Sequence, residues 1–273
     1  MNRTMITATN TLNQLQKQLD IIGHNLANVD TNGYKRRESN FTELLVQQMN
    51  NQLNPARDLP RLTPRGIRMG VGAKLAQSQM VTTQGSLQET NRPLDFALTN
   101  ENQFFKVLVQ ENGEGQIRYT RDGGFYVTPV NDREVMLVNA QGFPLLDEQN
   151  QFITFSSQSK EIQLQSGGVL DTGDGQFINL GIVMVDHPQY LEQKGGNLLG
   201  MPNNPPIPET EILRELTGIE RQEISLQQGS LEKSNVDVAK EMTDMMNVQR
   251  SYQFQSRSIT LADQMLGLVN GLR

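Results

Sequence analysis

Apolar residues recur in alternating steps of three and four at both ends of this 273-residue chain. Such an alternation averages 3.5 residues per turn and draws a narrow apolar seam along a helix, which suits a left-handed supercoil. The N-terminal seam comprises Met5, Ala8, Leu12, Leu15, Leu19, Ile22 and Leu26. With Gln255 in its one polar position, the C-terminal seam comprises Met245, Val248, Tyr252, Ile259, Ala262, Leu266 and Val269. The pattern predicts two terminal helices that need an apolar partner.

The first helix is expected over residues 3–27, and the segment Asn28–Gly33 should end it because Asn and Gly tolerate the left-handed backbone conformation. Asn, Gln and Thr cover its outer face, so the helix alone should be marginal in water. The second helix should run to about residue 272, with Ser234 and Asp237 at the spacing of an N-terminal cap. We expect the seams to be largely exposed in a single copy and buried in an assembly.

Between the helices, short β-strands are predicted, separated by Gly, Asn and Asp turns. The candidate strands are 104–110, 117–120, 125–130, 134–138, 151–155, 161–165 and 177–185. Their spacing favours an antiparallel barrel or sandwich. The expected fold class is therefore α+β, with terminal helices that form a coiled-coil layer and a central β-rich domain.

The domain organisation follows from these patterns. Residues 1–35 and 235–273 should form a helical assembly domain, and residues 74–234 a β-rich outer domain with a Gly/Pro-rich linker at 188–208. Residues 36–73 are expected to be an extended connector, because three prolines between 55 and 64 prevent regular structure there. At its start, a short amphipathic helix is suggested by Phe41, Leu44, Leu45 and Met49.

An internal echo links the two ends of the β-rich domain. The segment 84–91 reads QGSLQETN, and the segment 228–235 reads QGSLEKSN. We interpret them as two matching strand–turn elements that lie side by side and join the domain to the helices; chance similarity of turn-forming segments is the alternative.

Composition and motifs exclude several classes of protein. The chain has no cysteine, which rules out disulfides, thiol nucleophiles and zinc–thiolate sites. Its net charge is −6, and its densest basic run, Lys35–Arg37, is too short for a phosphate-binding groove, so no nucleic-acid partner is expected. No apolar run approaches the roughly 20 residues that cross a bilayer, and polar residues interrupt the first 20 positions, where a secretory signal would be apolar.

No catalytic, metal or cofactor site can be assembled from the motifs. The only histidines, His24 and His187, have neither a partner at metal-ligand spacing nor a nearby nucleophile. Three segments rich in Gly and Asp, namely 113–115, 121–124 and 171–175, lack the remaining positions of a phosphate loop or calcium loop and read as turns. We predict no enzymatic activity and no cofactor.

The segment from Ile22 to Lys35 resembles the signature of bacterial flagellar rod and hook proteins, a helix that ends in Asn-x-Ala-Asn before Thr-x-Gly-Phe/Tyr-Lys. The motif residues here are Asn25, Ala27, Asn28, Thr31, Gly33, Tyr34 and Lys35. The closing block of the family is similar to 231–237, which contains Ser234, Asn235, Val236 and Asp237. Other matching blocks are 84–85, 93–97, 104–105, 119–123, 241–242, 249–252 and 263–266. Arg92 and Gln255 are modest departures from the family pattern.

The resemblance implies a distal rod-type subunit, a Bacillus-like paralogue being one reading, because the chain has no room for the extra outer domain of a hook subunit. It further implies a subunit that passes unfolded through the flagellar export apparatus without a cleaved signal. Outside the cytoplasmic membrane, in the basal body, it would polymerise with itself and contact other rod and hook subunits. The resulting hollow helical tube would transmit torque and support hook assembly. The alternatives are a soluble dimeric coiled-coil binding module and a secreted cell-wall enzyme.

Overall fold

The computed structural model describes residues 2–43, 47–49, 67–69, 73–111, 113–159 and 162–271. The chain divides into two compact units, and each is described by itself. A helical unit comprises Met1–Leu26, Arg37–Gln79 and Val238–Arg273. A β-rich unit comprises Ala27–Arg36 and Met80–Asp237.

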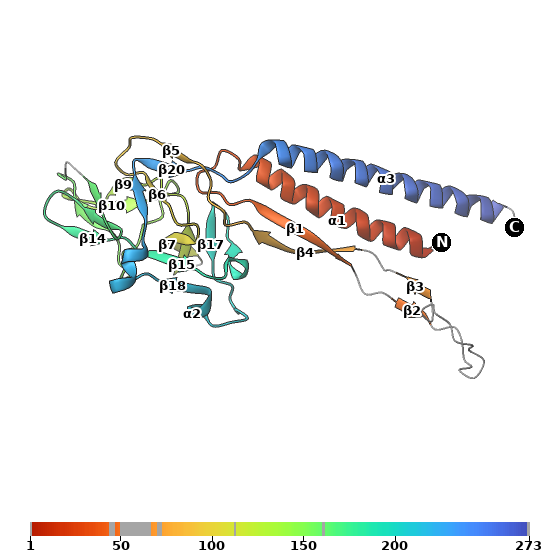
Figure 1. Ribbon diagram of the computed structural model, residues 1–273, viewed down its shortest axis with the longest axis horizontal. Coiled ribbons are helices and arrows are strands. Elements are labelled where there is room, and N and C mark those ends of the chain that lie inside the picture. Colours follow the sequence, from red (N-terminus) through yellow and green to blue (C-terminus); the bar gives the residue numbers. More distant parts are fainter. Residues whose placement is uncertain are drawn as a thin grey trace. The chain divides into compact units, whose positions relative to one another are not determined.

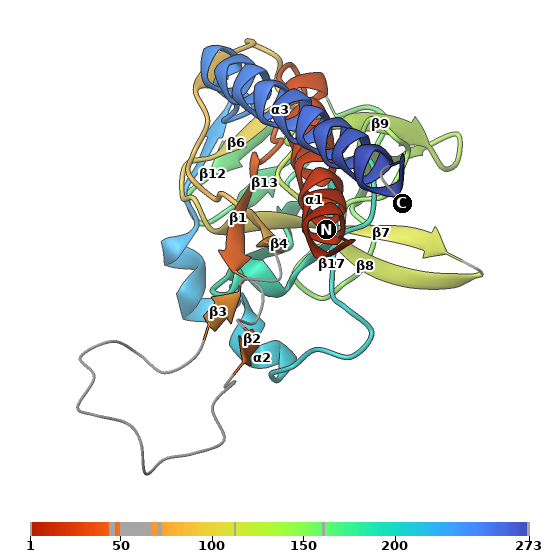
Figure 2. The same cartoon turned by 90° about the vertical axis from the view of Figure 1, so that its right-hand side faces the viewer.

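In the helical unit, α1 (Asn2–Ala27) and α3 (Val238–Gly271) lie side by side and antiparallel (Figures 1 and 2). Both predicted helices are thus confirmed, with ends close to the expected ones. Their seams face each other: Leu15 and Ile22 of α1 pack against Val248 of α3, flanked by Leu19 and Met245.

This packing overturns the expectation that the seams of a single copy are largely exposed. Leu15, Ile22 and Val248 are each at most 8 % exposed. The physical reason is that two narrow apolar stripes on one chain are present to each other at a high effective concentration. They can therefore pack together without a second copy. Only Tyr252, among the seam residues whose side chains are described, counts as exposed.

The helical unit also contains paired strands. β1 (Arg37–Glu43) pairs with β4 (Ala73–Met80), and β2 (Gln47–Met49) pairs antiparallel with β3 (Ile67–Met69). The prediction of a short amphipathic helix is wrong at the two positions that can be checked, because Phe41 lies in β1 and Met49 in β2. A few apolar residues cannot tell a short helix from a strand, and the long-range pairing decides. Leu44, Leu45 and the three prolines lie outside the described residues.

The β-rich unit is built around a six-stranded antiparallel sheet in the order β16-β17-β8-β7-β15-β18. In chain order these strands are β7 (Gln103–Glu111), β8 (Glu114–Thr120), β15 (Ile182–Val185), β16 (Glu192–Gln193), β17 (Leu198–Gly200) and β18 (Leu213–Glu215). The hairpin β7–β8 confirms a turn at this place, but Glu114 and Gly115, which were expected in the turn, belong to β8. Strands β16 and β17 come from the segment expected to be a linker.

Smaller sheets complete the unit. One has the order β11-β10-β9, another β12-β13-β14, and two further pairs are β19-β6 and β20-β5. Their bounds are β5 (Leu87–Glu89), β6 (Phe96–Leu98), β9 (Tyr126–Pro129), β10 (Glu134–Val138), β11 (Thr154–Ser156), β12 (Gln163–Gln165), β13 (Val169–Asp171), β14 (Phe177–Asn179), β19 (Leu226–Gln228) and β20 (Ser230–Glu232). Helix α2 (Glu209–Ile212) and two 3-10 turns, Pro188–Tyr190 and Gly218–Glu223, lie between strands.

The core forms on both faces of the central strands. Successive residues of a strand point to opposite faces, so Phe105 joins the main core with Phe96 and Phe125, whereas Phe104 packs with Tyr119 on the other face. The rings of Phe105 and Phe125 meet edge to face, with centroids 5.1 Å apart. The alternation places large side chains on both sides of β7, so this strand is central.

The described strands do not close a barrel, because the six-stranded sheet ends at β16 and β18. The predicted strand 177–185 is two strands, β14 and β15, in different sheets. Gly181 separates them, and a Cβ atom there would lie 2.5 Å from the carbonyl oxygen of Asp147. The chain changes sheet at a close backbone approach that only glycine permits.

The predicted echo is confirmed as a pair of neighbouring strands. β5 and β20 come from the two copies and pair antiparallel, with Leu87 opposite Glu232 and Gln88 opposite Leu231. In each strand, the leucine therefore lies opposite the residue that comes directly after the leucine of the other strand. This arrangement is a local two-fold relation between the segments.

Candidate assembly site

The outer face of α3 carries a second set of apolar side chains. These residues, which we call the outer stripe, are 53–72 % exposed and comprise Phe254, Leu261, Met265 and Leu268. Steps of seven, four and three residues place them on one side of the helix, away from the seam residues Val248 and Ala262. A solvated helix face normally carries polar residues, so the outer stripe is a candidate contact surface.

Three buried charges hold the β-rich unit together. The carboxylate of Glu232 accepts hydrogen bonds from Lys35 Nζ at 2.7 Å, Arg121 Nε at 2.5 Å and the Gly85 backbone N–H at 2.9 Å. The side chains of Lys35, Arg121 and Glu232 are at most 3 % exposed. We call these three side chains the buried ion cluster. It joins residues far apart in the sequence, including the exit of the chain toward α3.

The remaining donors of the ion cluster are taken up by backbone carbonyls. Lys35 Nζ donates to the carbonyl oxygens of Thr82 and Thr83, at 3.1 and 2.9 Å. The guanidinium of Arg121 donates to backbone oxygens of Leu98, Asn100, Glu101 and Gln103. Burial lowers the pKa of Lys35 and of Arg121, and the charge of Glu232 opposes that shift in both cases. Such a network is stable only while its carboxylate is present.

Asn235 bridges backbone segments in the same unit. Its Oδ1 atom accepts from the Arg36 N–H at 2.6 Å, and its Nδ2 atom donates to the carbonyl oxygens of Val81 and Thr83, each at 2.9 Å. One amide side chain thus makes the hydrogen bonds to these backbone groups that a neighbouring strand would otherwise make. Residues 233–237 belong to no helix or strand and α3 begins at Val238, so the cap expected from Ser234 is wrong.

Asn25 has the corresponding role in the helical unit. Its amide accepts from the Arg37 N–H at 2.9 Å and donates to the Arg37 carbonyl oxygen at 2.8 Å. It also donates to Glu241 Oε2 at 3.2 Å, and both side chains are buried. Asn25 therefore joins the end of α1 to the start of β1 and to the first turn of α3.

Gly33 and its neighbours form the turn after α1. The backbone of Gly33 has φ +66°, and a Cβ atom would lie 2.5 Å from the Asp122 nitrogen. The Thr31 hydroxyl donates to Asn28 Oδ1 at 3.2 Å, and Tyr34 is buried. The predicted stop and turn at 28–33 is thus confirmed, and glycine is required for two separate reasons.

The motif residues fall into two groups. Asn25, Gly33, Lys35 and Asn235 make the contacts described above; Asn25, Gly33 and Lys35 are buried, Asn235 is half-buried, and Val236 is also buried. Ala27 and Asp237 are exposed. The partners Arg121, Glu232 and Glu241 were absent from the predicted site. All three lie in segments that resemble the family's blocks, 119–123, 231–237 and 241–242, but that resemblance does not indicate which side chains pair.

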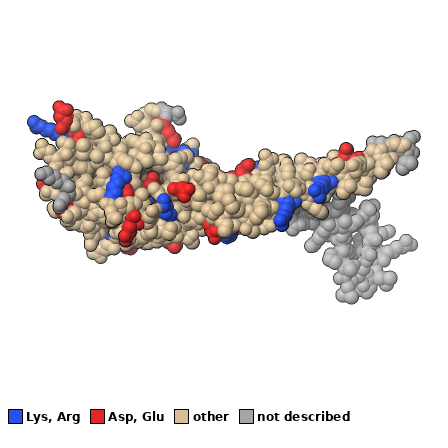
Figure 3. Space-filling model, turned by 90° about the horizontal axis from the view of Figure 1, so that it is seen from above, with Lys and Arg blue, Asp and Glu red and all other residues tan. Residues whose placement is uncertain are grey.

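The described residues do not support a metal-binding or charged ligand site elsewhere in the chain. Segment 171–175 forms the turn between β13 and β14, with Asp171 Oδ1 accepting from the Gly173 N–H at 3.0 Å. No group of three or more His, Cys, Asp or Glu in the described part of the chain could hold a metal ion. Charged side chains lie scattered over the face shown in Figure 3 and form no patch of one sign there. None of the helices in the described ranges is long and apolar enough to span a membrane.

Three family models match separate parts of the chain. "Flagella basal body rod protein" matches residues 5–35, "Flagellar hook protein FlgE/F/G D1 domain" matches 99–183, and "Flagellar basal body rod FlgEFG protein C-terminal" matches 227–272. The first and last of these ranges contain Lys35 and Glu232, two members of the ion cluster.

Curated relatives match over almost their full length. The chain is 46 % identical over 280 residues to the flagellar hook-basal body complex protein FlhP of Bacillus subtilis strain 168, with both chains covered completely. It is 34 % identical over 263 residues to the flagellar basal-body rod protein FlgG of Buchnera aphidicola subsp. Acyrthosiphon pisum, covering 93 % of this chain and 94 % of the relative. The FlgG of Borreliella burgdorferi is 33 % identical over 285 residues, covering 100 % and 99 %.

Proposed function

The chain belongs to the flagellar basal-body rod and hook protein family, and we propose that it builds a segment of the distal rod as a helical homopolymer. The family is one of structural proteins and not of enzymes. As a rod subunit of the flagellum, this protein assembles with other flagellar components in the basal body.

One observation carries the proposal of a homopolymer: α3 has two apolar faces, and a single copy covers only one of them. The seam face is buried against α1, while the outer stripe stays exposed. Burial of a large apolar side chain contributes about 1.5–3 kcal/mol, so four such residues can offset much of the ordering cost of association. Repetition of this contact around an axis would give an inner helical layer.

The finer parts of the proposal concern the polymer as a whole. The helical units form a coiled-coil inner layer of a hollow tube, and the β-rich units form its outer layer. The subunit crosses the export apparatus unfolded and assembles outside the cytoplasmic membrane. The tube transmits torque and supports hook assembly. The distal position is supported by relatives named FlgG and FlhP, and by a length that matches theirs.

The test changes the outer stripe without touching the seam. Leu261→Asp places a charge on a side chain that is 59 % exposed in the single copy, so the folded monomer should keep its helicity and its thermal midpoint. In the tube, the same carboxylate would be buried without a partner, at a cost of several kcal/mol per subunit. Concentrated wild-type protein should form tubes in negative-stain micrographs, whereas the variant should not.

The control is Gln16→Asp on α1, whose side chain is exposed in the single copy. Cells with Leu261→Asp should contain the subunit but lack hooks and motility, and cells with Gln16→Asp should swim. Tubes of normal appearance from Leu261→Asp would overturn the assignment of the outer stripe. Discrete dimers from the wild-type protein would instead favour a dimeric coiled-coil binding module.

A further inference from the structure

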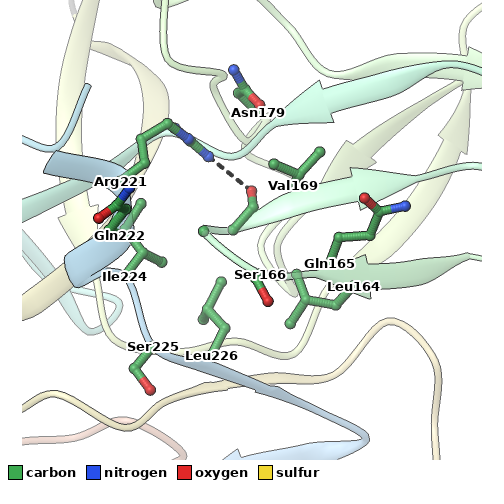
Figure 4. A pocket seen from close by; sticks show the side chains of 12 residues that line it. Leu164, Gln165, Ser166, Val169, Asn179, Arg221, Gln222, Ile224, Ser225 and Leu226 are labelled. Atoms are coloured by element: carbon green, nitrogen blue, oxygen red, sulfur yellow. Dashed lines mark hydrogen bonds between the residues drawn. The ribbon is translucent and has the colours of Figure 1, made fainter. Parts of the chain in front are cut away.

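A groove lies between two strand edges of the β-rich unit. One wall comes from β12 and the turn that follows it, including Leu164 and Ser166; the other comes from the segment Ile224–Leu226 at the start of β19. The cavity has a volume of about 680 Å³, and Figure 4 shows Leu164, Ile224 and Leu226 around it. The groove consists only of residues in the larger unit and is independent of the proposed helical contacts.

The edge of β19 presents main-chain groups to the groove. β19 pairs with β6. Two hydrogen bonds identify the bonded positions: the Thr99 N–H donates to the Ser225 oxygen, and the Gly229 N–H donates to the Asp95 oxygen. Bonded and non-bonded pairs alternate in an antiparallel ladder, so Leu226, opposite Leu98, is in a non-bonded pair. Its N–H and C=O therefore point away from β6, on the side where Leu226 lines the groove.

The facing edge of β12 has the same property. Leu164 is opposite Leu170 of β13, yet its N–H donates to Gln228 Oε1 at 3.0 Å. The pair Leu164–Leu170 is thus a non-bonded one, and the Leu164 C=O also points away from β13. No hydrogen bond from a described residue reaches the Leu164 oxygen or the Leu226 N–H and C=O.

Gln228 closes one end of the groove by imitating a strand. Its side-chain amide accepts from the Leu164 N–H and donates to the Ile162 oxygen at 2.7 Å. In a β-ladder, one residue of a neighbouring strand makes the same pair of bonds through its own N–H and C=O. Beyond this amide, the gap between the two edges continues toward Leu226 with no group of the described chain in that position.

Arg221 makes the wall of the groove rigid. Its guanidinium donates to the Gly168 oxygen at 3.0 Å, the bond drawn in Figure 4. It also donates to the Leu180 oxygen at 3.2 Å, which fixes the β12–β13 turn against the end of β14. Arg221 is itself 8 % exposed. A groove with fixed walls needs little reorganisation to bind a ligand.

We propose that this groove binds an extended peptide segment as an additional β-strand between β12 and β19. The Leu226 N–H would donate to a peptide carbonyl, and the oxygens of Leu164 and Leu226 would accept from peptide N–H groups. Leu164, Ile224 and Leu226 would contact alternate side chains of the segment, which should be apolar. The partner is thus a protein segment in extended conformation, with apolar residues at every second position.

The test uses isotope-labelled full-length monomer and a blocked pentapeptide with the sequence Val-Thr-Val-Thr-Val. The peptide should shift the Leu226 amide resonance in a saturable manner and slow its hydrogen exchange. A matched peptide, Val-Pro-Val-Pro-Val, keeps the apolar residues but lacks two N–H donors, and it should bind at least about tenfold more weakly. Ser166→Tyr, which fills the groove from its exposed edge, should abolish the shift.

Ser157→Tyr is the control, because Ser157 is exposed and outside the groove. If Ser166→Tyr does not fold, Ser225→Tyr fills the groove from the opposite wall. An unchanged Leu226 resonance at millimolar Val-Thr peptide, or equal binding of the two peptides, would overturn the proposal. Neither result depends on whether the protein forms tubes.

Discussion

Nζ of Lys35 lies 2.7 Å from Oε1 of Glu232, a residue 197 positions later in the sequence. Arg121 binds the other oxygen of the same carboxylate, so one buried anion faces two buried cations. The carboxylate connects the segment that follows α1 with the strand that precedes α3. Its loss is the most direct test of what holds the β-rich unit together.

Glu232→Gln should lower the free energy of unfolding by about 3–5 kcal/mol, because it leaves Lys35 and Arg121 buried without an opposite charge. Urea denaturation followed by circular dichroism measures this difference. Glu192→Gln is the control: Glu192 pairs with Lys194 at the surface, and its loss should cost no more than about 1 kcal/mol. Similar values for the two variants would show that the buried ion cluster contributes little.

Gly33→Ala should be more destabilising than Gly142→Ala. Both glycines have positive φ, so each alanine should cost about 1–2 kcal/mol in backbone strain. Only at Gly33 would the new Cβ also meet backbone atoms of Arg121 and Asp122 at 2.5 Å, which adds about 1–3 kcal/mol. Thermal unfolding of both variants checks the order, and a larger effect at Gly142 would contradict it.

Deprotonation of Tyr119 should lower the free energy of unfolding at high pH. Burial raises its pKa from 10.0 to about 12, and the nearby charges of Glu215 and Glu209 act in the same direction. The folded state then holds the proton more tightly, so the stabilisation is complete below pH 10 and is lost as the pH rises through about 12. A shift of this size corresponds to about 3 kcal/mol.

The measurement compares urea denaturation of the wild type and Tyr119→Phe between pH 9 and 11. The wild type should lose stability relative to the variant above pH 10, because there its unfolded state has begun to release the phenolic proton while its folded state has not. Parallel curves for the two proteins would mean that Tyr119 titrates alike in both states.

Leu15→Asp tests the seam between α1 and α3. Leu15 is 8 % exposed and packs in the cluster with Ile22 and Val248, so an unpaired carboxylate there should separate the helices at a cost of several kcal/mol. The monomer should lose helicity at 222 nm, and tubes should not form. Unlike Leu261→Asp, this change acts on the single copy first. Full helicity of the monomer would show that α1 and α3 do not depend on each other.

Local sequence patterns correctly predicted the elements that have a strong periodicity or a diagnostic turn. The helices at the two ends, the hairpin β7–β8 and the pairing of the echo segments were all predictable, since each depends on residues close in sequence or on a repeated pattern. The strand at Phe41 was not, because a short apolar segment becomes a strand only when β4 is available to pair with it.

The sequence by itself determined that the chain has two helices with apolar seams, a β-rich middle and the motifs of a rod and hook family. Only the tertiary structure decided that the seams cover each other and that the outer stripe is the face left open. It also decided that Lys35, Arg121 and Glu232 share one buried site. Periodicity reports which side chains avoid water, but the choice of partner depends on long-range geometry. A buried charge is stable only beside its counter-charge, wherever that lies in the chain.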